Sequence, residues 1–228
     1  MRLALTGATG LVGSLLAPRL VAAGYEVHTL QRRSDGRVFP HRHEHVAPTD
    51  RWAGIVATLA PEAAICALGT TMGKAGSPDA FAAIDRDLVL AFARAARAAG
   101  ARHLIAVSSV GADPASRHFY LRLKGEVERA LAAIGFERLD LLRPGLLRGA
   151  RGADRRLGER IGILLSPLAN LVLRGPLDPY AAIDAELVAG AAVALLRRRE
   201  PGTFVHHNRA LRALAASRPV DLPSAASL

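Results

Sequence analysis

Cysteine is nearly absent from the 228 residues, and its scarcity excludes a class of fold. Cys66 is the only cysteine, so the chain has no internal disulfide framework. The apolar strand-like sequence around it predicts a small core residue rather than a reactive thiol. A single thiol is typical of a reducing compartment, and we therefore expect a cytoplasmic protein.

Long apolar runs are missing as well. The most apolar late run, Ile161–Leu173, has 13 residues and is interrupted by Pro167, whereas a membrane-spanning helix needs about 20. We expect no membrane span, and we interpret the run either as a flap over a substrate or as a contact with a homodimer partner or another protein. The first ten residues lead straight into strand-like sequence, so we expect no secretory leader.

Aromatic residues make up only 4% of the chain, although its net charge is +10. Clustered positive charge attracts nucleic-acid phosphates, and aromatic side chains between the charges stack on bases. Here the arginines are scattered through helix-like stretches such as AFARAARAAGARH, without interleaved aromatics. We therefore expect a small-molecule substrate and no nucleic-acid partner.

The chain does contain a regular alternation of short apolar runs and longer amphipathic stretches. This pattern predicts an α/β fold, a doubly wound parallel sheet in which the ligand site lies at the carboxyl ends of the strands. We assign residues 1–228 to one domain, with a core over about 1–150 and a small C-terminal substrate and cap region over about 151–228. The predicted helices are Leu11–Ala23, Ala80–Ala99 and Tyr120–Ile134, and the predicted strands are Arg2–Leu5, Glu26–Gln31, His45–Ala47, Ala64–Leu68, His103–Val107 and Arg138–Leu142.

The first predicted strand ends in the sequence TGATGLVG. Gly7 permits a tight turn, Gly10 lets the backbone approach a pyrophosphate, and Gly13 lets the following helix pack closely on the sheet. The amino terminus of that helix then attracts phosphate without any charged side chain. The turn predicts cofactor contacts from Gly7, Thr9, Gly10, Leu11, Val12 and Gly13.

A second motif combines a strand end with the start of a helix. Ser108 and Ser109 follow a buried strand, and Tyr120 opens a helix on which Lys124 lies one turn later. Lys124 is one of only two lysines in the chain. An ammonium near a tyrosine favours its phenolate form, so the pair can transfer protons near neutral pH. A strand-end serine could hold the substrate oxygen.

Together with the RPG sequence at Arg143–Gly145, these motifs resemble the short-chain dehydrogenase/reductase superfamily. The stretches CALGTTMGKAG, IDRDLVLAFARAA, SSVGAD, YLRLKGEVE and LLRPGLL are most similar to its atypical branch that contains the Tat-interacting-protein oxidoreductase. The resemblance implies a Rossmann domain that binds NADP(H), with Tyr120 as the acid-base group, Lys124 as its helper and ribose ligand, and Ser109 or Ser108 as the substrate-orienting hydroxyl. From their positions in such a fold, further residues are expected to contact the cofactor: Leu68, Gly69, Thr70, Ser108, Lys124 and Pro144.

Two departures from the typical family pattern keep other functions open. Ser109 precedes Tyr120 by only 11 residues, and no asparagine occurs before position 170 to complete the usual proton relay. We therefore weigh three functions: an NADP(H)-dependent oxidoreductase acting on a carbonyl or alcohol, a non-catalytic NADP(H)-binding regulatory or protein-interaction module, and a nucleotide-sugar epimerase or dehydratase. The chain is short for the third.

Cofactor preference depends on the end of the second strand, HTLQRRSDG. An NAD-preferring site has a carboxylate about 20 residues beyond the glycine turn, where it binds the ribose 2′-hydroxyl and repels a 2′-phosphate. Arg32 and Arg33 occupy this region instead. Guanidinium groups bind phosphate through paired hydrogen bonds, so we predict a preference for NADP(H).

The remaining polar clusters carry weaker signals. In HRHEH, three alternate histidines, His41, His43 and His45, would share one side of an extended strand and could bind a metal. Because this segment lies between the second and third strands, we assign it no metal. Asp85 and Asp87 fit helix-surface charges or ion-pair partners better than catalytic acids.

Overall fold

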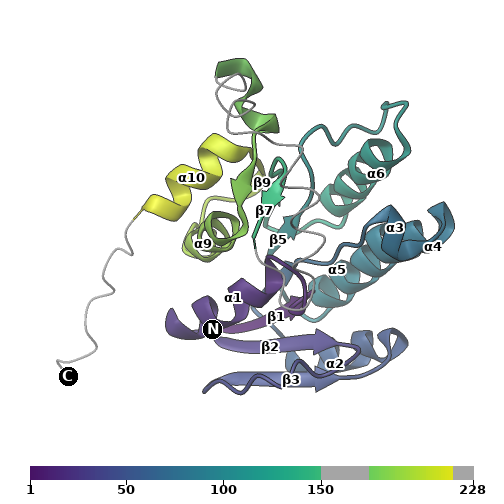
Figure 1. The fold of residues 1–228 in the computed structure, drawn as a ribbon. Coiled ribbons are helices and arrows are strands. Elements are labelled where there is room, and N and C mark those ends of the chain that lie inside the picture. The colour runs from purple at the N-terminus through teal and green to yellow at the C-terminus, as the bar shows by residue number, and fades with distance from the viewer. Residues whose placement is uncertain (150–174, 218–228) are drawn as a thin grey trace.

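The computed structural model describes residues 1–149 and 175–217, and it confirms the doubly wound parallel sheet. Seven strands pair in parallel in the order β3-β2-β1-β4-β5-β6-β9 (Figure 1). The order reverses between β1 and β4, which is where ligands bind in folds of this kind. The strands are β1 (Arg2–Thr6), β2 (Glu26–Gln31), β3 (Arg42–Val46), β4 (Ala63–Cys66), β5 (His103–Val107), β6 (Arg138–Leu142) and β9 (Gly202–His206).

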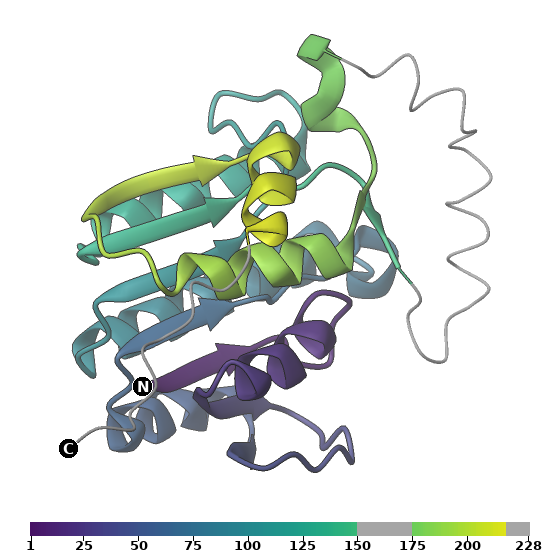
Figure 2. The ribbon, with the colours of Figure 1, turned by 90° about the vertical axis from the view of Figure 1, so that its left-hand side faces the viewer.

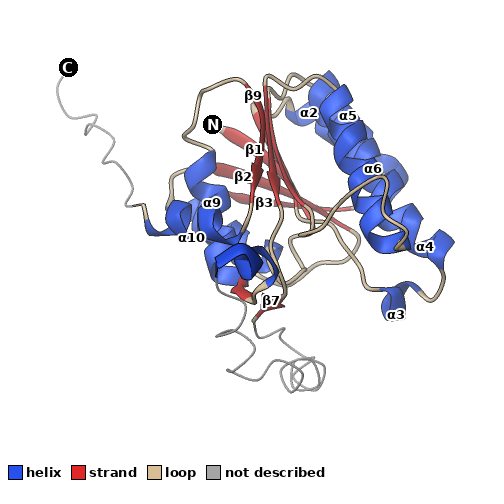
Figure 3. Cartoon of the chain, turned by 90° about the horizontal axis from the view of Figure 1, so that it is seen from above, coloured by secondary structure: helices blue, strands red, loops and turns tan. Residues whose placement is uncertain are grey.

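Helices cover both faces of the sheet, as the view from above shows (Figure 3). One face carries α1 (Gly13–Ala22), α9 (Ala185–Leu195) and α10 (Asn208–Ala216), which lie toward the viewer in Figure 2. The other carries α2 (Trp52–Leu59), α5 (Val89–Ala98) and α6 (Phe119–Ala133). In β1, Leu3 and Leu5 pack toward α1 and α9, whereas Ala4 packs toward α2. Burial on both faces explains why the central strands are continuous apolar runs.

Helix α5 continues two preceding segments in one helical run. The run consists of α4 (Pro78–Ala82), the π-helical turn η2 (Ala83–Leu88) and α5, and it corresponds to the single helix predicted over Ala80–Ala99. A short helix, α3 (Met72–Ala75), precedes it. π-Helical turns are rare and frequently occur at functional sites.

Several elements differ from the sequence prediction. Strand β3 begins three residues earlier than predicted and ends at Val46, and β4 ends at Cys66 rather than Leu68. Helix α2 was not predicted, and beyond residue 150 a cap region was predicted but no individual helix or strand. There β9 supplies the seventh strand and α9 covers the sheet, so these residues belong to the main fold, while the domain division at about 150 stays a prediction.

The chain leaves the sheet after β6 and returns to it through α9. Two short parallel strands, β7 (Leu147–Arg148) and β8 (Ile183–Asp184), pair at the two ends of this excursion. The turn η3 (Gly175–Tyr180) precedes β8. The apolar run 161–173, interpreted above as a flap or a contact surface, lies outside the described residues.

A buried ionic cluster lies on the α10 face of β5, β6 and β9. The carboxylate of Asp140, which has no exposed surface, accepts hydrogen bonds from His103 and His206, each at 2.7 Å, and two from Arg138 at 2.6 and 2.8 Å. Burial alone would raise the pKa of Asp140, but these hydrogen bonds hold it well below the usual range of an aspartate.

Among the described residues, no helix is long and apolar enough to cross a membrane.

Candidate active site

The glycine turn lies at the carboxyl end of β1, at the point where the strand order reverses. Gly7 has a φ of +78°, and a Cβ added there would lie 2.3 Å from the carbonyl carbon of Ala67. A Cβ on Gly13 would lie 2.0 Å from the Gly7 carbonyl oxygen, so only glycine lets α1 begin this close to the strand. Thr9 and Gly10 between them are exposed. The exposed turn therefore leaves the amino end of α1, with its positive dipole, accessible to an anionic ligand.

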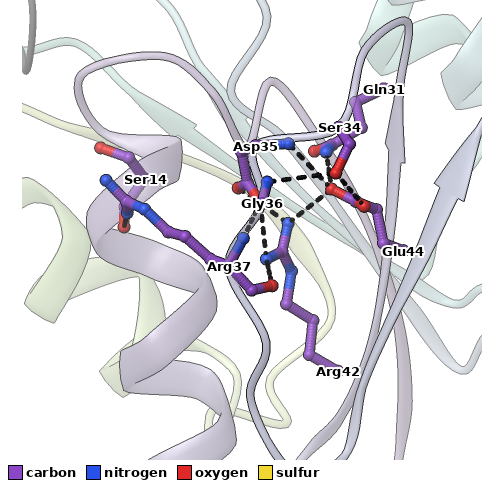
Figure 4. A network of polar contacts seen from close by, with 8 residues as sticks. All are labelled: Ser14, Gln31, Ser34, Asp35, Gly36, Arg37, Arg42 and Glu44. Atoms are coloured by element: carbon purple, nitrogen blue, oxygen red, sulfur yellow. Dashed lines mark hydrogen bonds and ion pairs between the residues drawn. The ribbon is translucent and has the colours of Figure 1, made fainter.

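A braced loop follows β2 on the same edge of the sheet (Figure 4). Arg42 donates two hydrogen bonds, of 2.9 and 2.8 Å, to the carboxylate of Asp35. Burial raises the pKa of Asp35, but these bonds and one from the Arg37 backbone N–H lower it overall. Glu44 accepts from Gln31, from Ser34 and from the Asp35 backbone N–H. Both carboxylates are therefore held by neighbouring donors.

The loop carries three exposed arginines, one of which contacts α1. Arg32 and Arg33 are exposed, and neither makes an ion pair with another described residue. Arg37, which the sequence prediction did not include, donates to the Ser14 backbone carbonyl at 3.2 Å and so reaches the first turn of α1. The signal that could have found it is its place in the same QRRSDGR segment.

Helix α6 presents the predicted tyrosine and lysine on one side. The ring of Tyr120 packs edge-on against that of Phe81, with 5.8 Å between their centroids, and 37% of the residue is exposed. Lys124 is 94% buried, with its Nζ atom 6.0 Å from the centroid of the Tyr120 ring. The tyrosine therefore faces open space, while the ammonium lies behind it in the protein.

Asp85 is a buried ion-pair partner of Lys124, one of the two roles that the sequence analysis left open for it. It lies in the π-helical turn, is 1% exposed, and its Oδ1 atom is 2.7 Å from the Nζ atom of Lys124. Its Oδ2 atom accepts from the backbone N–H of Thr70 at 2.8 Å. The ion-pair alternative was therefore correct for Asp85, and Asp87 is an exposed charge paired with Arg86 at 2.7 Å.

The two strand-end serines have different surroundings. The Ser108 hydroxyl donates to Glu128, which is itself buried and held by several hydrogen bonds from Arg143. The hydrogen bond with Glu128 raises the pKa of Arg143. The Ser109 hydroxyl instead donates to the Val110 carbonyl at 3.2 Å, a local contact that a ligand could replace.

The RPG motif connects this region to the rest of the fold. Pro144 is buried, and its carbonyl accepts from the Val110 N–H at 3.0 Å. The Gly145 N–H donates to the side chain of Asn208, a fully buried residue at the start of α10. Asn208 in turn donates to the Ala181 carbonyl at 2.7 Å. The motif thus fixes the serine loop and the returning chain to the end of β6.

The interior behind Tyr120 is closely packed. A residual cavity of about 10 Å³ is lined by Cys66, Asp85, Ser108, Lys124, Glu128 and apolar neighbours. Cys66 is buried, as predicted, and burial raises the pKa of its thiol. A larger cavity of about 360 Å³ lies between β9 and α10, and none of the predicted site residues line it.

The model of the NAD-dependent epimerase/dehydratase family matches residues 3–123, which include the glycine turn and Tyr120. The chain belongs to this family. Its resemblance to the short-chain dehydrogenase/reductase superfamily is confirmed at that level, whereas the Tat-interacting-protein branch stays a prediction.

Curated relatives of this epimerase/dehydratase family member occur in fungi. The protein fmp52, mitochondrial, of Aspergillus fumigatus is 37% identical over 83% of the chain and 84% of its own length. FMP52, mitochondrial, of Saccharomyces cerevisiae is 36% identical over 74% of each chain. Because the relatives are named as mitochondrial proteins, the expectation of a cytoplasmic protein is wrong.

Solved structures share the fold of this family member. UDP-glucose 4-epimerase from Thermotoga maritima, solved with UDP-glucose, aligns with a TM-score of 0.70 and 16% identity over 91% of this chain and 77% of that enzyme. UDP-glucose 4-epimerase from Thermus thermophilus, solved with NAD, aligns with a TM-score of 0.68 and 20% identity over 95% of this chain and 82% of that enzyme. At these identities the likeness establishes the Rossmann-like fold.

Proposed function

We propose that the chain is an NADP(H)-dependent oxidoreductase that interconverts a carbonyl compound and an alcohol. The observation that carries the proposal is the placement of Tyr120: its ring is partly exposed while Lys124, one turn later on α6, is buried behind it. The glycine turn opens at the carboxyl end of β1, on the same edge of the sheet as the strand-end serines. Cofactor and proton donor would thus meet at one edge.

The residues of the glycine turn fit a dinucleotide. The positions that a Cβ would fill, Gly7 and Gly13, leave a backbone surface at the amino end of α1 to which the pyrophosphate would bind. The nicotinamide end of the cofactor would be contacted by Leu68, Gly69, Thr70 and Pro144. When bound, the nicotinamide would supply the hydride that reduces the substrate's carbonyl carbon, or accept it in the reverse reaction.

The chain's own residues would handle the proton. In the reducing direction the Tyr120 hydroxyl donates its proton to the carbonyl oxygen, and the resulting phenolate is stabilised by the nearby ammonium. Lys124 has three donors, of which Asp85 accepts one, so two remain for a ribose hydroxyl and for the tyrosine. We assign substrate orientation to Ser109, because Ser108 already donates to Glu128.

Preference for NADP(H) over NAD(H) rests on the loop after β2. Four arginines and two carboxylates lie between Arg32 and Glu44, which leaves an excess of two positive charges. Arg42 and the donors around it hold the carboxylates, while Arg32 and Arg33 are exposed. A 2′-phosphate beside these guanidinium groups would gain charge-assisted hydrogen bonds.

The test is to measure turnover with NADPH on aldehydes, quinones and nucleotide sugars, in the unmodified protein and in Tyr120→Phe. On a confirmed substrate, the loss of the hydroxyl should reduce kcat by about 10² to 10⁴, with cofactor affinity nearly unchanged, because the ring and its contact with Phe81 remain. Tyr25→Phe removes a hydroxyl outside the site and is the matched control. A wild-type rate in Tyr120→Phe would refute the mechanism.

A nucleotide-sugar epimerase is the second candidate, favoured by the family to which the chain belongs. Epimerisation passes a hydride from the sugar to the oxidised cofactor and then returns it, so with NADP+ or NAD+ in place of NADPH the nucleotide sugars should be changed without net reduction of the cofactor. Cofactor binding with no turnover on any substrate would favour a regulatory module instead.

A further inference from the structure

Edge strand β3 and its neighbour β2 carry a cluster of imidazole and carboxylate groups. His28 lies opposite His43, and Leu30 opposite His45, in the parallel register. Leu30 packs in the core with Trp52 of α2, so the alternating side chains Glu26, His28, His43 and His45 share that face of the sheet. The sequence interpretation grouped His41 with these histidines and missed Glu26 and His28, which come from the neighbouring strand.

The distances within the cluster resemble those in a metal site. The Nε2 atom of His28 lies 3.1 Å, and that of His43 3.6 Å, from the Oε1 atom of Glu26. Ligand atoms bound at 2.0 to 2.2 Å around a tetrahedral Zn²⁺ are about 3.3 to 3.5 Å apart. One ligand atom from each of the three residues lies within 4.8 Å of the others.

We propose that Glu26, His28 and His43 bind a divalent transition-metal ion, of which Zn²⁺ is the representative, with a fourth position open to water. Two imidazole nitrogens and one carboxylate oxygen suit Zn²⁺, whereas Mg²⁺ and Ca²⁺ prefer oxygen ligands alone. The ion would join β3, at the edge of the sheet, to β2.

His45 would support the site from behind. Its Nε2 atom is 3.0 Å from the Nδ1 atom of His28, so a proton on Nδ1 of His28 can be shared with it while the opposite nitrogen of His28 points to the metal. Such partners of a ligating histidine fix its tautomer and ring orientation.

Metal binding requires one rearrangement of the side chains. The rings of His28 and His43 are stacked, with centroids 4.6 Å apart and planes 17° apart, and a shared ion must lie near the plane of both. The His28 side chain is only 10% exposed, whereas that of His43 is 52% exposed, so His43 is the ring with room to turn once its stacking on His28 is broken. Arg2, opposite Glu26 in the register with β1, adds a competing positive charge.

The experiment titrates the untagged protein with ZnCl₂ by calorimetry and follows its thermal unfolding with and without the ion. We expect one Zn²⁺ per chain and a higher Tm. The exposed residues are replaced, in Glu26→Gln and His43→Gln, so that the fold is kept, and each should weaken binding by at least about tenfold. The matched control is His41→Gln, an exposed histidine of the same segment outside the cluster, which should bind as the wild type does.

A second readout reports coordination. Co²⁺ bound in place of Zn²⁺ should show the strong visible absorption of a four-coordinate ion in the wild type and in His41→Gln, and should lose it in His43→Gln. The proposal is overturned if Zn²⁺ does not bind, if both cluster variants bind it with unchanged affinity, or if Mg²⁺ raises the Tm as much as Zn²⁺ does.

Discussion

Replacing Asp85 by asparagine tests how much the fold depends on the ion pair behind the proposed active site. The substitution keeps the shape of the side chain and removes its charge, so Lys124 is left as a buried ammonium opposite an amide. The side chains of Asp85 and Lys124 are 1% and 7% exposed, and the residual cavity beside them is about 10 Å³, room for at most one water molecule. This cavity can therefore supply at most one water molecule to solvate the stranded charge.

Breaking a buried pair by removing one partner costs about 3 to 5 kcal/mol of unfolding free energy, and we expect Asp85→Asn to lie in that range. Lys124→Met should cost a similar amount, because it strands the carboxylate with only the Thr70 N–H as a donor. The double variant removes both charges. Its loss should be smaller than the sum of the single losses by about 0.5 to 3 kcal/mol.

Urea unfolding followed by circular dichroism measures all three variants against the wild type. Asp87→Asn is the matched control, since its carboxylate pairs with Arg86 at the surface, where such pairs contribute about 0 to 1 kcal/mol. If Asp85→Asn and Asp87→Asn are equally stable, or if the two single losses simply add in the double variant, then the pair does not stabilise the fold as a unit.

Two further predictions concern the cofactor and acid stability. Replacing both Arg32 and Arg33 by alanine should remove most of the preference for NADPH while NADH affinity is kept. In the unmodified protein, calorimetry at two salt concentrations should show the difference in affinity between NADPH and NADH decreasing as salt screens the phosphate contact. Equal affinities for the two cofactors in the unmodified protein would contradict the predicted preference. Asp140→Asn should lower Tm near neutral pH, because it strands Arg138. The pKa of Asp140 is lower in the folded protein than in the unfolded chain, so its contribution to stability is present above about pH 4 and is lost as the pH falls further. The difference in Tm between the wild type and Asp140→Asn should therefore decrease in acid. A difference in Tm that does not change with pH would contradict this prediction.

The sequence predicted correctly those elements whose residue pattern is determined by local contacts. Gly7 is required by its positive φ and Gly13 by the Gly7 carbonyl beside it, both local to the turn, so their spacing was sufficient to place β1 and α1. Strand β3 was misplaced because RHEHV has polar residues on both faces, as an edge strand can, and so lacks the alternation of apolar and polar residues that predicts a strand. Helix α2 is only eight residues long and lies between Pro48 and Pro61, which made it resemble a loop.

Contacts between residues that are distant in the sequence were harder to predict. Asp85 reads as one polar position in an amphipathic helix, and only the π-helical turn and the arrival of α6 bring it to Lys124, 39 positions away. The same limit hid the contact of His28 with His43, since neither strand alone contains the ligand set. Strand β9, GTFVH, follows Pro201 directly and has only two apolar residues, too few to predict a strand.

The short ladder between β7 and β8 has a consequence for how this protein can change. Its two residue pairs, Leu147 with Ile183 and Arg148 with Asp184, close the excursion at its base, and the Ile183 N–H donates to the Leu146 carbonyl beside them. The ends of the excursion are thus fixed whatever its length. Because each doubling of the chain length between two joined positions costs only about 0.6 kcal/mol of entropy, relatives that differ in length between Arg148 and Ile183 can keep the same sheet.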